Sequence, residues 1–99
     1  MASREFQSLR ALLPSMLARL ARERGDGAGL AGLWRELAGS NLSRSATALR
    51  LDGGVLVLRP ADGAWARELP GHLDALGARA RELTAGEVHS VRLAGRDEP

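Results

Sequence analysis

Arginine is the residue type in this sequence with the clearest chemical potential. All fourteen fixed positive charges are guanidinium groups, because the chain has no lysine. A guanidinium stays charged at physiological pH and presents a planar fork of donors to phosphate or carboxylate oxygens. Arg44, Arg50 and Arg59 lie on or beside a predicted hairpin, where they could contact nucleic-acid phosphates without reading sequence. A solvated polar face is the alternative interpretation, and a biased base composition would also explain the arginine usage.

The net charge limits what this arginine content can mean. Twelve Asp and Glu residues oppose the arginines, so the chain carries only +2 at pH 7. Residues 1–50 hold eight arginines and four acids, whereas residues 51–99 hold six arginines and eight acids, which gives +4 and −2. We therefore expect a local anion-binding surface, more in the first half of the chain, on a protein that is not basic overall.

Other reactive side chains are sparse. The absence of cysteine excludes disulfides, thiolate catalysis and zinc ribbons, and the absence of lysine excludes phosphate-loop and Schiff-base chemistry. His72 and His89 fall in different predicted elements and lack the spacing of metal ligands. Ser40, Ser43 and Ser45 have no histidine close in sequence that could activate them. We expect no enzyme activity, no metal, no cofactor and no small-molecule substrate.

Two further features have both a structural and a functional interpretation. The segment Gly29-Leu30-Ala31-Gly32 matches the Gly-x-x-Gly that clamps nucleic-acid backbone in KH domains, but a flexible linker explains the same glycines. Trp34 belongs to a helical apolar stripe and is expected in the core. Trp65, in the first turn of a predicted short helix, is either a core residue or an anchor for a partner.

Apolar residues at spacings of three and four predict four helices. They cover about residues 14–24, 30–44, 63–69 and 72–83, with a short turn before the first helix and a flexible connection over 25–29. Pro14 suits a first helical position, and Asp62 is a suitable cap for the third helix. Gly39 is expected to let the second helix pack closely against a neighbour.

Alternation with a period of two predicts three strands, over residues 47–51, 55–58 and 87–93. A hairpin turn at Asp52-Gly53-Gly54 joins the first two. Thr47, Leu49 and Leu51 are expected on one face of the first strand and Arg50 on the other. The tail, residues 94–99, is expected to fray.

The order α-α-β-β-α-α-β predicts an α+β sandwich of two layers, in which helices cover one face of a three-stranded sheet. The 99 residues suit one domain, 1–99, with its core over about 8–94. No apolar run approaches the roughly 20 residues that cross a bilayer, and the N-terminus has no signal pattern. We expect a cytoplasmic protein with no membrane partner.

A set of short motifs resembles the DciA family of bacterial replication proteins over about residues 8–94. The motifs are Leu33-Trp34-Arg35-Glu36-Leu37-Ala38-Gly39, Leu42, Leu51-Asp52-Gly53-Gly54-Val55-Leu56-Val57, Trp65-Ala66-Arg67-Glu68-Leu69 and Val88-x-x-Val91-Arg92-Leu93. The Trp-Ala-x-Glu-Leu segment after the second predicted strand, preceded by the helical tryptophan and Gly39, makes the set specific. The chain departs from the family at Ser45 and Ala48, where a histidine and a proline are usual.

The resemblance implies a KH-like domain of the type II arrangement. It also implies a non-catalytic protein that binds the replicative helicase DnaB, helps load it onto DNA and binds DNA itself. Among the residues that match the family pattern, Trp65 and Glu68 are the candidates for contact with the helicase. Many members also carry a flexible basic extension outside the domain.

Three functions follow from the sequence as alternatives. The first is a helicase-loading adaptor that also binds single-stranded DNA weakly and without sequence preference. The second is a general KH-like domain that binds RNA or DNA, and the third is a protein-interaction domain that binds no nucleic acid. They differ first in their partner.

Overall fold

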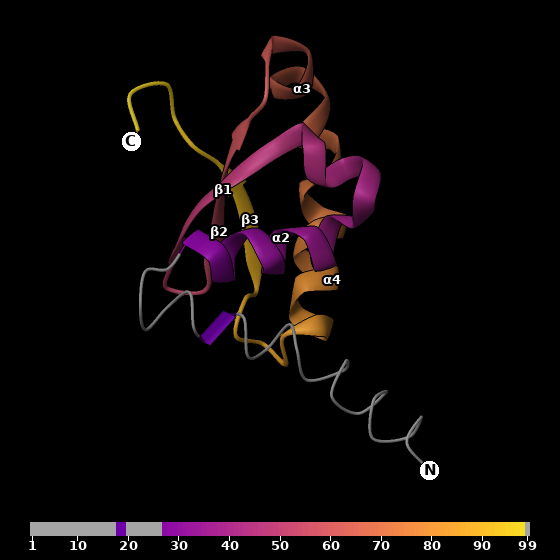
Figure 1. Cartoon of the computed structure of the whole chain (residues 1–99), viewed down its shortest axis with the longest axis vertical. Coiled ribbons are helices and arrows are strands. Elements are labelled where there is room, and N and C mark those ends of the chain that lie inside the picture. The colour runs from indigo at the N-terminus through magenta and orange to yellow at the C-terminus, as the bar shows by residue number, and fades with distance from the viewer. Residues whose placement is uncertain (1–17, 20–26, 99) are drawn as a thin grey trace.

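A computed structural model of the chain describes residues 18–19 and 27–98 (Figure 1). Its elements, in chain order, are helix α2 (Gly27–Leu42), the 3-10 turn η1 (Ser43–Ser45), strands β1 (Ala46–Asp52) and β2 (Val55–Pro60), helix α3 (Gly63–Glu68), the 3-10 turn η2 (Leu69–His72), helix α4 (Leu73–Leu83) and strand β3 (Ser90–Leu93). Ala18 and Arg19 are helical, and the rest of the predicted first helix and the turn before it lie outside the described residues.

The three strands form one mixed sheet in the order β1-β2-β3. β1 and β2 pair antiparallel as a hairpin, and β3 pairs parallel to β2. Helices α2 and α4 pack on the same side of this sheet, and their apolar residues meet Leu56 and Leu58 of β2 in the core (Figure 1). The predicted α+β sandwich is therefore confirmed, and its arrangement is that of a small KH-like domain.

Trp34, in the middle of α2, joins this helix to η1 and to the start of β1. Its side chain is buried, and its Nε1 donates to the carbonyl oxygens of Ser43 and Ala46, each at 3.0 Å. A buried indole N–H needs such a partner. The prediction that Trp34 belongs to the core is confirmed.

A β-bulge in β1 changes which residues of this strand share a face, so the prediction for this strand needs a correction. The pairing with β2 shifts between Ala48 and Arg50, so Leu49 has no partner in the register. Ala48 and Leu51 consequently pack against the core, while Thr47 is exposed. The prediction that Thr47, Leu49 and Leu51 share one face is wrong, because one extra residue reverses the alternation beyond it.

The glycines of α2 also differ from expectation. The helix begins at Gly27, so Gly29 and Gly32 lie within it, and the Gly-x-x-Gly segment is helical instead of forming a linker or loop. Gly39 has a φ of 82° and a ψ of 172°, which interrupts the helix, and a Cβ at that position would meet nothing within 4 Å. Gly39 thus supplies a backbone conformation that L-residues avoid, and the predicted close packing is wrong.

In the C-terminal segment, the strand is shorter than predicted and the tail is more ordered than predicted. β3 begins only at Ser90, because Thr84 Oγ1 holds the preceding turn by accepting from the Val88 N–H at 2.9 Å. After β3, the Ala94 N–H donates to the Leu58 carbonyl oxygen at 2.8 Å. The predicted fraying is wrong over residues 94–98, where Glu98 is held against the sheet by hydrogen bonds. Within the described part of the chain, no helix is long and apolar enough to cross a membrane.

Candidate nucleic-acid and partner surfaces

The sheet face turned away from the helices carries three arginines in neighbouring positions. The register places Arg50 of β1 and Arg92 of β3 on either side of Val57 in β2, and paired residues point to the same face of a sheet. Arg59 lies two residues beyond Val57 on β2 and therefore shares this face. Leu58, which alternates with them, packs in the core. We call Arg50, Arg59 and Arg92 the arginine face.

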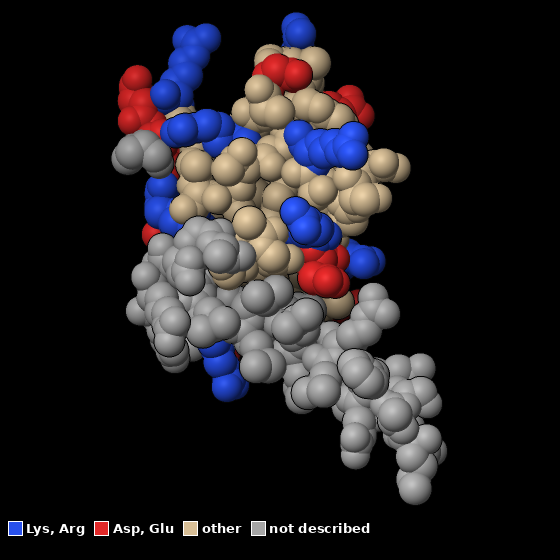
Figure 2. Space-filling model, viewed as in Figure 1, with Lys and Arg blue, Asp and Glu red and all other residues tan. Residues whose placement is uncertain are grey.

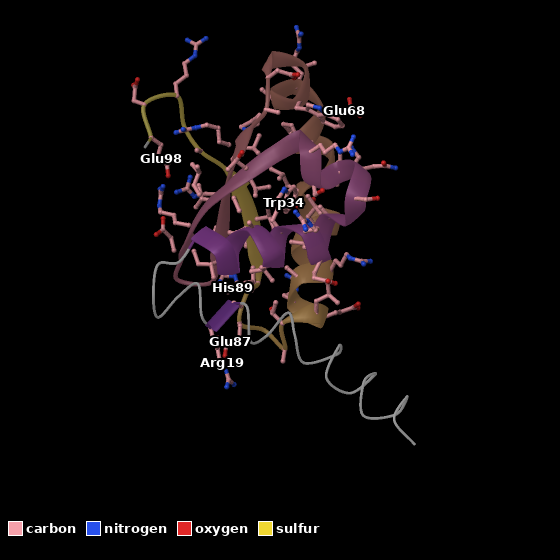
Figure 3. All side chains as sticks on the ribbon, viewed as in Figure 1. Arg19, Trp34, Glu68, Glu87, His89 and Glu98 are labelled. Carbon is pink, nitrogen blue, oxygen red and sulfur yellow. The ribbon has the colours of Figure 1, made fainter. Side chains whose placement is uncertain are left out.

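The carboxylate of Glu98 forms ion pairs with Arg50 and Arg92 of the arginine face. Figure 3 labels Glu98 on the C-terminal segment. Arg92 donates from Nη1 to Oε1 at 2.9 Å and from Nη2 to Oε2 at 2.7 Å, the two-pronged geometry of strong guanidinium–carboxylate pairs. Arg50 Nη2 also donates to Oε2, and the Gly95 N–H donates to Oε1 at 2.9 Å. Arg59 Nη2 donates to the backbone carbonyl oxygen of Glu98 at 2.8 Å. All three arginines therefore contact one tail residue.

These contacts lower the pKa of the acidic partner and raise the pKa values of the two basic partners. The hydrogen bond from Arg92, followed by that from the Gly95 N–H, lowers the pKa of Glu98. Its hydrogen bond to Glu98 raises the pKa of Arg92. The pKa of Arg50 is raised first by Asp52, whose Oδ2 accepts from Arg50 Nε at 2.8 Å. Figure 2 shows basic and acidic side chains next to one another along the margin of the molecule that carries the tail.

Arg44 lies apart from the arginine face. It is exposed in η1 and lines a hollow between α2 and β1 together with Trp34 and Arg35. Of the three arginines predicted to contact nucleic acid, the structure thus brings Arg50 and Arg59 together and adds Arg92. Arg92 sits between Val91 and Leu93 in the predicted third strand, so the alternation of that strand already pointed it away from the core.

The two residues suggested for partner contact lie on α3, at one end of the molecule (Figure 1). Asp62 caps this helix as predicted, since its Oδ1 accepts from the Trp65 N–H at 2.9 Å. Trp65 is partly buried and packs against the core, so it contributes to the core while part of its side chain stays exposed. The Glu68 side chain is 67% exposed, and its Oε1 lies 3.6 Å from His72 Nε2. Positions three apart on a helix share a face, which places Trp65 and Glu68 together.

Both histidines contact described residues of neighbouring segments: His72 Nε2 lies 3.6 Å from Glu68 Oε1. His89 Nε2 lies 3.0 Å from the Gly53 carbonyl oxygen and closes the tip of the hairpin. In the part of the chain that the structure describes, no group of three or more His, Cys, Asp or Glu residues could hold a metal ion.

The comparison with protein families gives a match over most of the chain. The family model described as "Dna[CI] antecedent, DciA" matches residues 8–93. This range contains the arginine face, α3 and both tryptophans, and it ends before Glu98. No curated protein and no solved structure matches the chain significantly.

Proposed function

The chain belongs to the DciA family, and we propose that it is a replication adaptor that binds the replicative helicase DnaB and helps load it onto DNA in the cytoplasm. Membership implies a role related to helicase loading, in a family of non-catalytic replication adaptors. The observation that carries the proposal is the family match over residues 8–93, which spans every described strand and both helices of the core.

We assign the helicase contact to Trp65 and Glu68. A partly exposed tryptophan beside an exposed charge is typical of the residues that dominate protein interfaces. α3 has no fully buried residue and projects at one end of the molecule, so a partner could reach both side chains without disturbing the sheet (Figure 1).

We assign weak, sequence-independent binding of single-stranded DNA to the arginine face, with Arg44 as a separate phosphate contact. Guanidinium groups on a sheet suit phosphate contacts, which position nucleic acid without reading its bases.

Two alternative functions differ from this proposal in their partners. A general KH-like protein would bind RNA or DNA without a helicase, and a protein-interaction domain would bind the helicase alone. The partial neutralisation of the arginine face by Glu98 and Asp52 favours the latter of these two.

The experiment that tests the adaptor role is titration of the full chain with the DnaB of its own host, followed by a helicase-loading assay. We expect a complex at micromolar concentrations and faster unwinding. Trp65→Ala should weaken the complex by roughly tenfold or more, as truncation of an interface anchor does. Glu68→Gln, which leaves the core untouched, should weaken it less. Glu82→Gln, an exposed glutamate of α4, is the matched control and should bind as the wild type does.

The alternatives are distinguished by adding oligo-dT and oligo-rU to the same titrations. Capture of the chain by the helicase but by neither oligonucleotide would select the protein-interaction domain. Binding of either oligonucleotide with no helicase complex would select the general nucleic-acid-binding domain. The absence of a helicase complex at micromolar concentrations contradicts the adaptor role.

A further inference from the structure

Donors of two residues of the arginine face and one backbone N–H of the tail converge on a single carboxylate. Nη1 and Nη2 of Arg92, Nη2 of Arg50 and the Gly95 N–H all point to the two oxygens of Glu98. Carboxylates and phosphates accept the two-pronged guanidinium contact in the same way. The site that holds Glu98 therefore has the donor arrangement required by two non-bridging oxygens of a phosphodiester.

The donors and the carboxylate differ in how they are attached to the fold. One arginine comes from each of the three strands, and Val57 between Arg50 and Arg92 is fully buried, so the guanidinium donors stand on a packed sheet, whereas the Gly95 N–H belongs to the tail. Glu98 instead comes from the tail. In the described part of the tail beyond Ala94, Glu98 accepts hydrogen bonds from Arg50, Arg59 and Arg92. The carboxylate can therefore leave while the strands stay in place.

The charge of the site favours the binding of an anion in place of the Glu98 carboxylate. The three arginines and Asp52 together carry +2, and Glu98 reduces that sum to +1 when it is bound. We propose that Glu98 is an intramolecular competitor for phosphate: it occupies the oxyanion site of the arginine face, and the backbone of single-stranded DNA must displace it to bind there. The proposal rests on the DNA binding proposed above, and Glu98 lies outside the range that the family match covers.

The test compares Glu98→Gln with Glu82→Gln, because both remove one negative charge from the chain and only Glu98 contacts the arginine face. Binding of a fluorescent oligo-dT is measured by anisotropy at several salt concentrations. We expect Glu98→Gln to bind roughly fivefold more tightly than Glu82→Gln, since the phosphate no longer competes with two partly buried ion pairs. The slope of log affinity against log salt should steepen by about 0.7 for each additional phosphate that the protein neutralises.

A third variant tests whether the increase in affinity depends on the arginine face. Arg92→Gln in the Glu98→Gln background should remove the increase in affinity, and the amide signal of Gly95 in wild-type protein should shift on addition of oligo-dT. Equal binding by Glu98→Gln and Glu82→Gln overturns the competition. Binding by Glu98→Gln alone supports it while contradicting DNA binding by the intact chain. If no variant binds oligo-dT, the competition is overturned, and the helicase titration, which uses no DNA, still decides the adaptor role separately.

Discussion

The ionisation of Glu98 links the order of the C-terminal tail to pH. Its pKa is lowered in the folded protein, first by Arg92 and then by the Gly95 N–H. A carboxyl group with a lowered folded pKa contributes its full stabilisation above its unfolded pKa. That stabilisation is lost as the pH falls toward the folded pKa. At neutral pH the tail contact is therefore at full strength, and acid is the condition that weakens it.

We accordingly predict that Glu98→Gln lowers the melting temperature at pH 7 and that the difference from wild type shrinks in acid. The narrowing should begin below about pH 5, near the ordinary glutamate range, and continue as the pH falls further. Thermal melts of both proteins from pH 7 to pH 2 measure this difference. Glu82→Gln is again the control, because the exposed Glu82 lies on α4, away from the arginine face. A difference for Glu98→Gln that is constant over the whole range contradicts the prediction.

The residues of the arginine face were predictable to different degrees. Arg50 and Arg59 follow from their places in a predicted hairpin, and Arg92 follows from alternation in the third strand. Glu98 does not follow from any local pattern, because it is 48 residues from Arg50 and 39 from Arg59 along the chain. Only the tertiary fold brings the tail beside the sheet. A carboxylate in a polar C-terminal segment is otherwise typical of a solvated tail.

At the scale of elements, the order of helices and strands was predictable because each local signal agreed with the fold. Asp62 caps α3, and the Asp52-Gly53-Gly54 turn joins β1 to β2. The bulge of β1 was not predictable, since Thr47, Leu49 and Leu51 also fit a continuous alternation with Arg50 on the other face. Gly29 lies in α2 although the sequence predicts a flexible connection there, because tertiary packing of α2 outweighs the low helix propensity of glycine.

The hairpin turn provides a prediction at this scale, because its two glycines differ in their surroundings. Both have positive φ, 57° at Gly53 and 85° at Gly54. A Cβ at Gly53 meets nothing within 4 Å, whereas one at Gly54 would lie 2.6 and 2.7 Å from ring atoms of His89. Gly53→Ala should therefore cost about 1 kcal/mol of unfolding free energy, from the backbone conformation alone.

Gly54→Ala should cost about 2–3 kcal/mol, because the His89 ring must also move and give up its contact with the Gly53 carbonyl oxygen. Urea unfolding of the two variants, with wild type as reference, measures both costs. Equal destabilisation by the two substitutions would show that the His89 ring does not constrain the turn.

At the scale of the whole molecule, the proposed helicase surface and the arginine face lie next to each other. Arg59 of the arginine face lines one hollow together with Gly63 and Ala66 of α3 and with Arg96 of the tail. α3 projects at the same end of the molecule at which the tail lies (Figure 1). A helicase bound to α3 and a DNA strand bound to the arginine face would therefore be held side by side on a molecule with a 13.5 Å radius of gyration.

This arrangement predicts that the two binding activities can be removed separately. Arg92→Gln in the Glu98→Gln background should reduce oligo-dT binding and leave the affinity for DnaB unchanged, because Arg92 does not lie on α3. Glu68→Gln should weaken the helicase complex and leave oligo-dT binding unchanged, because Glu68 does not contact the arginine face. Titrating each variant with helicase and oligonucleotide, first singly and then together, measures both affinities and the ternary complex. If either substitution lowers both affinities equally while the thermal melt is unchanged, the helicase and the DNA share one surface, and the side-by-side arrangement is wrong.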